Sequence, residues 1–263
     1  MIYDINGNEL NSLDYDLTVK AINHRGYSTV APENTLPAYK LSKEKGFFYV
    51  ETDVSFTSDN VAMLLHDNTI NRTSNGSGTL SNMTYSEVRQ YDFGSWKSPK
   101  YAGTVIPTLK EFIVLCRDIS LYPYIELKDN GGYTQAQVQS IVDTVHDNGM
   151  AGNVTYISFS STFLGYVKDY DSSARLGYLS SSAPPSDLSV CQGLKTTNNE
   201  VFYDVKYSAL SNEKCNTFSD AGIPIEVWTV NSESDITNLN SYVSGVTSDS
   251  LIAGKVLYHS AMS

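Results

Sequence analysis

Two carboxylates and a histidine stand close together in the stretch YVETDVSFTSDNVAMLLHD, residues 49–67. Glu51 and Asp53 are two positions apart in an apolar run, and His66 ends the next apolar run. Side chains two positions apart share one face of a β-strand, so the two carboxylates should project together. Carboxylates are preferred ligands of hard divalent cations, and an imidazole can move protons near neutral pH. The stretch therefore predicts a metal ligand pair beside a general acid or base.

A third carboxylate has the same kind of setting in YPYIELK, residues 122–128, where Glu126 and Lys128 share one face of a predicted strand. Burying Glu126 beside Glu51 and Asp53 without compensation would cost several kcal/mol per charge or force protonation. A divalent cation removes that penalty. All-oxygen ligation favours Ca²⁺ or Mg²⁺, although nearby histidines keep zinc or manganese as alternatives.

The other candidate groups lie at the ends of further predicted strands. His24 and Arg25 follow the run KAIN, and an imidazole pair of His24 and His66 suits general acid and base catalysis. Arg25 and Lys128 supply a local positive charge that would hold the phosphate or carboxylate of an anionic substrate, the alternative for Arg25 being an ion pair with Glu33. Trp228, in EVWTVN, would either flank the leaving group or serve in packing.

Short runs rich in β-branched and aromatic residues alternate with helical patterns, which predicts βα units around a parallel sheet. The nine candidate strands are residues 20–23, 47–54, 61–66, 122–128, 153–159, 174–179, 200–205, 224–230 and 243–249. Helix starts are marked by the capping boxes Thr84 to Glu87 and Thr108 to Glu111, and by Asn34 or Thr35 ahead of an earlier helix. A further helix is expected over residues 134–148.

Nine strands are one too many for an eight-stranded barrel. The pair Asp59 and Asn60 leaves so short a link that the strands on either side must be antiparallel. The run 61–66 should therefore fold back on the second strand, and a two-residue turn would place Asp53 opposite His66. The fold class predicted is α/β, a TIM (β/α)₈ barrel with a β-hairpin inserted after strand 2.

The composition sets limits on partners and organisation. The chain has 263 residues and a formal net charge of −11, which disfavours nucleic acid and anionic membranes as partners. We expect an N-terminal leader, residues 1–20, packed on one barrel domain, residues 21–263. Three widely spaced cysteines indicate buried thiols. No run is long enough for a membrane span, the start lacks the features of a signal peptide, and the cellular location stays open.

The motifs taken in order resemble those of the glycerophosphodiester phosphodiesterases. They are HRGYSTVAPENTLPAY (24–39), VETDVSFTSDNVAMLLHD (50–67), INRTSNGSG (70–78), IPTLKEF (106–112), YIELK (124–128), ISFSS (157–161) and VWTVN (227–231). The resemblance implies a TIM barrel with one divalent cation, Ca²⁺ or Mg²⁺, on Glu51, Asp53 and Glu126. It also implies that His24 and His66 form the acid and base pair, and that Arg25 and Lys128 contact phosphate. The segment GVTSDS, residues 245–250, departs from the family by lacking the usual following proline.

Substrate identity stays open at this point. The expected reaction is hydrolysis of a small or polymeric glycerophosphodiester to glycerol phosphate and an alcohol, with water or the neighbouring glycerol hydroxyl as nucleophile. One alternative is a hydrolase of poly(glycerol phosphate) teichoic acid in a secreted or phage-tail setting. Another is a phospholipase D-like lipid hydrolase, which would need an apolar lip. A non-catalytic binding module is disfavoured because every expected catalytic group is present.

Overall fold

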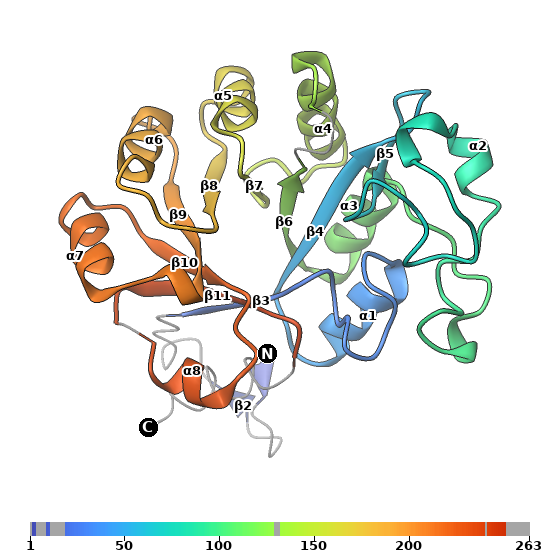
Figure 1. The fold of residues 1–263 in the computed structure, drawn as a ribbon, viewed down its shortest axis with the longest axis horizontal. Helices are drawn as coiled ribbons and strands as arrows, with labels where there is room; N and C mark the ends of the chain where they lie inside the picture. The colour runs from blue at the N-terminus through green and yellow to red at the C-terminus, as the bar shows by residue number, and fades with distance from the viewer. Residues whose placement is uncertain (1, 4–8, 11–18, 129–131, 240, 251–263) are drawn as a thin grey trace.

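The computed structural model describes residues 2–3, 9–10, 19–128, 132–239 and 241–250 (Figure 1). Within these residues eight parallel strands form a closed barrel: β3 (Lys20–Asn23), β4 (Tyr49–Phe56), β6 (Tyr122–Leu127), β7 (Thr155–Ser158), β8 (Arg175–Ser180), β9 (Val201–Lys206), β10 (Ile225–Trp228) and β11 (Val243–Ser248). Strand β3 pairs with both β11 and β4, which closes the ring. The predicted TIM barrel is therefore confirmed.

Helices follow most strands and lie outside the ring, as Figure 1 shows for α4 to α7. The α-helices are α1 (Leu36–Glu44), α2 (Tyr85–Val88), α3 (Leu109–Ile119), α4 (Gln135–Asp147), α5 (Ser161–Tyr170), α6 (Asp187–Leu194), α7 (Asn212–Asp220) and α8 (Glu233–Thr237). Three short 3₁₀ helices are η1 (Leu80–Asn82), η2 (Pro99–Tyr101) and η3 (Tyr207–Ala209). This alternation orients the carboxyl ends of all eight barrel strands to one mouth, where barrel enzymes build their sites.

The capping residues position these helices as the sequence predicts. The hydroxyls of Thr84, Thr108 and Thr134 each accept a hydrogen bond from the backbone N–H three residues later, completing capping boxes. Thr35 holds the cap position of α1 without a side-chain cap bond. Its hydroxyl donates instead to the carbonyl oxygen of Pro32.

The ninth strand, β5 (Ala62–Leu64), runs antiparallel to β4, as expected for the inserted hairpin. Its register differs from the prediction by one residue, because Phe56 pairs with Ala62 and the link is longer than Asp59 and Asn60 alone. Within the link, the N–H of Thr57 donates to the Val61 carbonyl oxygen. The placement of His66 directly opposite Asp53 is therefore wrong, since Leu65 donates its N–H to the Asp53 carbonyl.

Two apolar cores hold the mouth of the barrel in shape. The outer faces of β4 and β6, including Val50, Val54, Ile125 and Leu127, pack in the large core between strands and helices. The segment between β5 and α3 has its own core, made of Met63, Leu65, Ile70, Leu80, Val88, Phe93 and Ile106. This second core holds the chain on either side of His66. The three cysteines are buried and free, which confirms the prediction of unpaired thiols.

At the N-terminus, β1 (Ile2–Tyr3) and β2 (Glu9–Leu10) pair antiparallel. The expected packing of the leader on the barrel and the end of the barrel domain over residues 251–263 lie outside the described residues. None of the described helices is both long and apolar enough to cross a bilayer.

Candidate active site

Three buried carboxylates converge at the mouth of the barrel. Glu51 and Asp53 come from β4, and Glu126 stands beside Asp53 in the parallel register of β6. One carboxylate oxygen from each lies within 4.8 Å of the others. All three residues are buried, and Asp53 is completely inaccessible. The alternation of β4 thus brings together the carboxylates that the sequence predicts to converge.

Two cations balance part of this negative charge. Lys128, just beyond β6, has its Nζ 2.9 Å from Glu126 Oε1 and 3.5 Å from Asp53 Oδ1. Arg25, just beyond β3, has its Nε 3.2 Å from Asp53 Oδ2, and its backbone N–H donates to Glu51. The Arg25 guanidinium also pairs with Glu33 at 3.0 Å, so the ion pair considered as an alternative is present together with the contact to Asp53.

Each candidate catalytic histidine is held by a carboxylate through Nδ1. His24 Nδ1 lies 2.6 Å from Asp249 Oδ1, while its Nε2 is 3.9 Å from Glu51 Oε2. His66 Nδ1 lies 2.7 Å from Asp67 Oδ1. A carboxylate on Nδ1 favours the tautomer and ring orientation that leave Nε2 available for proton transfer. In both histidines Nδ1 faces a carboxylate, so Nε2 is the nitrogen left for proton transfer.

The pKa values of the three buried carboxyl groups are shifted in different directions. Burial raises the pKa of Glu51 well above its ordinary value, and the charges of Asp53 and Glu126 add to this shift. Burial acts the same way on Asp53, but Arg25 and Lys128 outweigh it and lower the Asp53 pKa to about 2. Burial and the charge of Asp53 raise the pKa of Glu126 to about 7. Only Asp53 thus keeps a low pKa, because Arg25 and Lys128 do not offset the burial of all three carboxylates.

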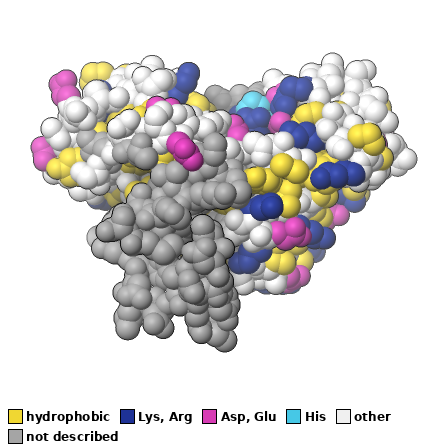
Figure 2. Space-filling view, turned by 90° about the horizontal axis from the view of Figure 1, so that it is seen from below, with side chains coloured by type: hydrophobic (Ala, Val, Ile, Leu, Met, Phe, Trp, Pro, Cys, Tyr) yellow, Lys and Arg dark blue, Asp and Glu magenta, His cyan; other side chains and the backbone are white. Residues whose placement is uncertain are grey.

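All the candidate residues except Asp53 line one cavity of about 300 Å³. His24, Arg25, Glu51, His66, Glu126, Lys128 and Trp228 all contribute to its wall. Trp228 meets Phe159 edge to face at 5.6 Å and donates its indole N–H to the Asp204 carbonyl. Figure 2 shows a histidine among basic and acidic side chains in a hollow at the upper edge of the molecule.

The structure also brings in residues that the sequence analysis did not assign. Asp249 orients His24, and Asp67 orients His66. Asn34 is buried and donates its amide to Asp53 Oδ2 at 2.8 Å. Arg72 joins Asp67 to Glu33 by paired hydrogen bonds. Asp67 directly follows His66, and Asp249 follows the last strand; these positions at strand ends were the available signal.

A divalent cation fits the carboxylate cluster. Glu51 Oε1 is buried and has no hydrogen-bond donor among the described residues, while the buried oxygens Asp53 Oδ1 and Glu126 Oε1 share the single ammonium group of Lys128. Oxygen atoms left in this state are costly unless a cation approaches them. Their close spacing and all-oxygen chemistry match the preferences of Ca²⁺ or Mg²⁺.

The glycerophosphoryl diester phosphodiesterase family matches residues 24–253, which include every group in this cavity. The chain belongs to this family. Members are phosphoric diester hydrolases, and the match spans the barrel from the end of β3 to beyond β11.

Relatives and solved members support the assignment to glycerophosphoryl diester phosphodiesterases. A glycerophosphodiester phosphodiesterase of Bacillus subtilis is 25% identical, and the match covers 87% of this chain and 82% of the length of that protein. Glycerophosphodiester phosphodiesterase 1 of mouse is 38% identical over 47% of this chain and 38% of its own length. A phosphodiesterase structure from Oleispira antarctica, in complex with the product sn-glycerol-3-phosphate, has a TM-score of 0.84 and 27% identity, and covers 95% of this chain and 98% of its own.

Proposed function

We propose that this family member hydrolyses glycerophosphodiesters to glycerol phosphate and an alcohol by acid and base catalysis of two histidines. The observation that carries the proposal is the single cavity that contains His24, His66 and Lys128 with the buried carboxylates. The sn-glycerol-3-phosphate in the Oleispira antarctica structure supports glycerol phosphate as the product.

The two cations would bind the phosphate. Arg25 and Lys128 reach the carboxylate cluster from β3 and β6, so a phosphate at the cavity mouth would meet positive charge from two sides. Arg can donate two parallel hydrogen bonds to phosphate oxygens, and Lys acts as a point charge. Both would stabilise the charge that builds on the nonbridging oxygens during P–O cleavage.

The histidines would supply the two proton transfers. One imidazole takes a proton from the attacking water, or from the neighbouring glycerol hydroxyl, as the new P–O bond forms. The other gives a proton to the oxygen of the alcohol as the old P–O bond breaks. On the glycerol-hydroxyl route this step leaves a cyclic phosphate, which water then opens to glycerol phosphate with the two imidazoles in exchanged roles. Burial lowers the pKa of His66, and Arg25 adds to the effect, which favours a neutral imidazole able to accept a proton.

Glu51, Asp53 and Glu126 would hold one divalent cation. When bound, a cation of this kind supplies Lewis-acid charge neutralisation to the phosphoryl oxygens. The ligand set supports this role because it is buried, convergent and short of hydrogen-bond donors.

The test is hydrolysis of a panel of glycerophosphodiesters with detection of released glycerol phosphate. The wild-type protein should release it, and His24→Ala and His66→Ala should each reduce turnover by at least about a hundredfold. His146→Ala is the matched control. His146 lies on α4, pairs with Asp171 at the end of α5 and does not line this cavity. Full activity in either cavity variant, with normal melting temperature, would refute the two-histidine mechanism.

A further inference from the structure

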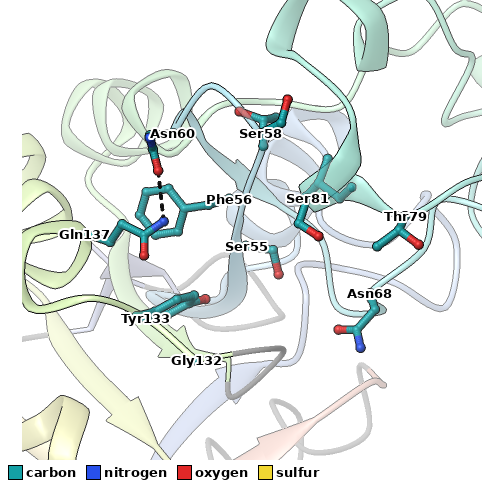
Figure 3. A pocket seen from close by; sticks show the side chains of 12 residues that line it. Ser55, Phe56, Ser58, Asn60, Asn68, Thr79, Ser81, Gly132, Tyr133 and Gln137 are labelled. Atoms are coloured by element: carbon teal, nitrogen blue, oxygen red, sulfur yellow. Dashed lines mark hydrogen bonds between the residues drawn. The ribbon is translucent and has the colours of Figure 1, made fainter.

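A second pocket, of about 440 Å³, lies between the β4–β5 hairpin, η1 and the start of α4 (Figure 3). Its lining consists of Ser55, Phe56, Thr57, Ser58, Asn60, Asn68, Thr79, Leu80, Ser81, Gly132, Tyr133 and Gln137. Figure 3 shows Ser81, Thr79 and Asn68 along one side, with Phe56, Tyr133 and Gln137 along the other.

The chemistry of this lining is unusual for so acidic a chain. Among the described residues, the lining side chains include no Asp, Glu, Lys, Arg or His, although they carry hydroxyls and amides that both donate and accept hydrogen bonds. The side chains of Ser58, Asn68 and Ser81 are exposed and that of Thr79 is half-buried, and none of the four has a hydrogen-bond partner within the described part of the chain. The opposite wall is shaped by the rings of Phe56 and Tyr133, which meet edge to face at 5.3 Å.

The pocket adjoins the catalytic groups through the chain itself. The Tyr133 hydroxyl accepts the backbone N–H of Lys128 at 3.1 Å and donates to the carbonyl of Val54. Asn68 lies two residues after His66, and Ser55 lies two residues after Asp53. A phosphodiester has two arms, and a diester bound at the cavity could therefore place one arm in this pocket.

We propose that this pocket binds the leaving alcohol of the diester when that alcohol is a neutral polyhydroxylated group, a sugar or a polyol. The inference rests on the proposed phosphodiesterase function and specifies its substrate class. Free hydroxyl and amide groups match the hydroxyls of such a ligand, and an aromatic ring suits its C–H faces. The volume lies in the range of small-molecule sites.

Other leaving groups match the lining less well. A quaternary ammonium group is held by carboxylates or by a cage of aromatic faces, and the described residues of this wall include no carboxylate and two aromatic rings. A further phosphate of a polymer would need Arg or Lys, which are absent from the described lining. An acyl chain would leave the hydroxyl and amide groups without partners.

The test compares kcat/KM for glycerophosphoinositol with kcat/KM for glycerophosphocholine. Wild-type protein should prefer the inositol diester, because its ring hydroxyls meet the unpaired groups of the pocket. Asn68→Ala and Ser81→Ala should each lower the inositol to choline ratio by about fivefold, the worth of a neutral hydrogen bond. Asn82→Ala is the control, because Asn82 is exposed on the same 3₁₀ helix without lining the pocket.

A change of charge sharpens the comparison. Asn68→Asp keeps the shape of the side chain and places a carboxylate in the pocket, so the ratio should shift further toward the cationic choline diester. The backbone carbonyl of residue 68, which accepts the N–H of Leu80, is unaffected by either substitution. A melting temperature close to that of the wild type would show that the variants remain folded.

The outcomes separate this inference from the proposed function. If the wild-type protein hydrolyses both diesters and the ratio is the same in wild type, Asn68→Ala, Ser81→Ala and Asn68→Asp, the pocket assignment is wrong and the phosphodiesterase activity stands. If no diester is hydrolysed, the proposed function fails. Calorimetric titration of His24→Ala with glycerophosphoinositol then tests whether the pocket binds the polyhydroxylated alcohol. Binding weakened about fivefold by a second substitution, Asn68→Ala, supports it, and absent or unchanged binding overturns it.

Discussion

His24 Nδ1 lies 2.6 Å from Asp249 Oδ1, and the two residues are 225 positions apart in the chain. The pairing of β3 with β11 builds this contact, because His24 donates its backbone N–H to the carbonyl of Ser248. The other carboxylate oxygen of Asp249 accepts the Asn231 side-chain amide at 2.8 Å. The imidazole is therefore fixed by the closure of the barrel.

Asp249→Asn should impair turnover more than substrate binding. The amide has nearly the shape of the carboxylate, but it cannot supply the charge that stabilises an imidazolium at His24. We expect kcat to fall at least about tenfold with KM changed little, as for other carboxylates that orient a reactive histidine.

The control for that substitution is Asp220→Asn, which changes an exposed aspartate at the end of α7. Asp249→Glu should recover part of the lost turnover, because it restores the charge. An unchanged kcat in the Asp249→Asn enzyme would show that Asp249 does not position His24 for catalysis.

Much of this site follows from local rules that can be read in the sequence. Alternation in β4 places Glu51 and Asp53 on one face, and the same alternation in β6 places Glu126 near Lys128. Turn and cap residues set the strand order and the helix starts. The hairpin register was the exception. The link has five residues, 57–61, and is closed by a hydrogen bond between Thr57 and Val61, which the turn residues Asp59 and Asn60 did not reveal.

Contacts made by barrel closure could not be predicted in the same way. The bonds from Asp249 to His24 and from Asn34 to Asp53 join residues whose spacing depends on the stagger of several strands. Arg72 is a similar case, since its guanidinium reaches both Asp67 and Glu33 across the insertion. A sequence shows such residues at strand ends and in loops, but not which pairs meet.

The carboxylate cluster predicts that Ca²⁺ or Mg²⁺ stabilises the protein. The three buried carboxylates Glu51, Asp53 and Glu126 share the charges of Arg25 and Lys128, so a cation that binds only the folded state should raise the free energy of unfolding. At a hundredfold excess over Kd the gain is about 2.7 kcal/mol. Chelation should reverse it, and differential scanning calorimetry with and without the ion measures the shift directly.

Glu51→Gln tests where the cation acts. This variant should bind the ion more weakly and show a smaller calorimetric shift, whereas Glu44→Gln, on the exposed face of α1, should behave as wild type. An equal shift in Glu51→Gln and wild type would place the stabilising ion elsewhere.

Asp204 gives a prediction about the stability of the barrel core. This residue of β9 is buried, and its Oδ1 has no hydrogen-bond partner among the described residues. Burial raises its pKa well above the ordinary value, and the charges of Glu226 and Glu126 add to the rise. The folded protein thus retains a proton here at pH values where the unfolded chain has released it.

Asp204→Asn should therefore stabilise the protein by an amount that grows with pH. Below about pH 4 the unfolded carboxyl is also protonated, so the wild type loses nothing by burying a neutral acid. As the pH rises, the free energy of unfolding of the wild type falls by up to about 1.4 kcal/mol per pH unit until Asp204 ionises in the folded protein. The Asp204→Asn variant has no carboxyl group at this position and does not show this fall. Denaturant unfolding of both proteins in chelated buffers from about pH 5 to about pH 8 measures the difference. Asp220→Asn should show no such trend, and a difference between Asp204→Asn and wild type that is constant or shrinks over this range would mean that Asp204 is ionised in the folded state.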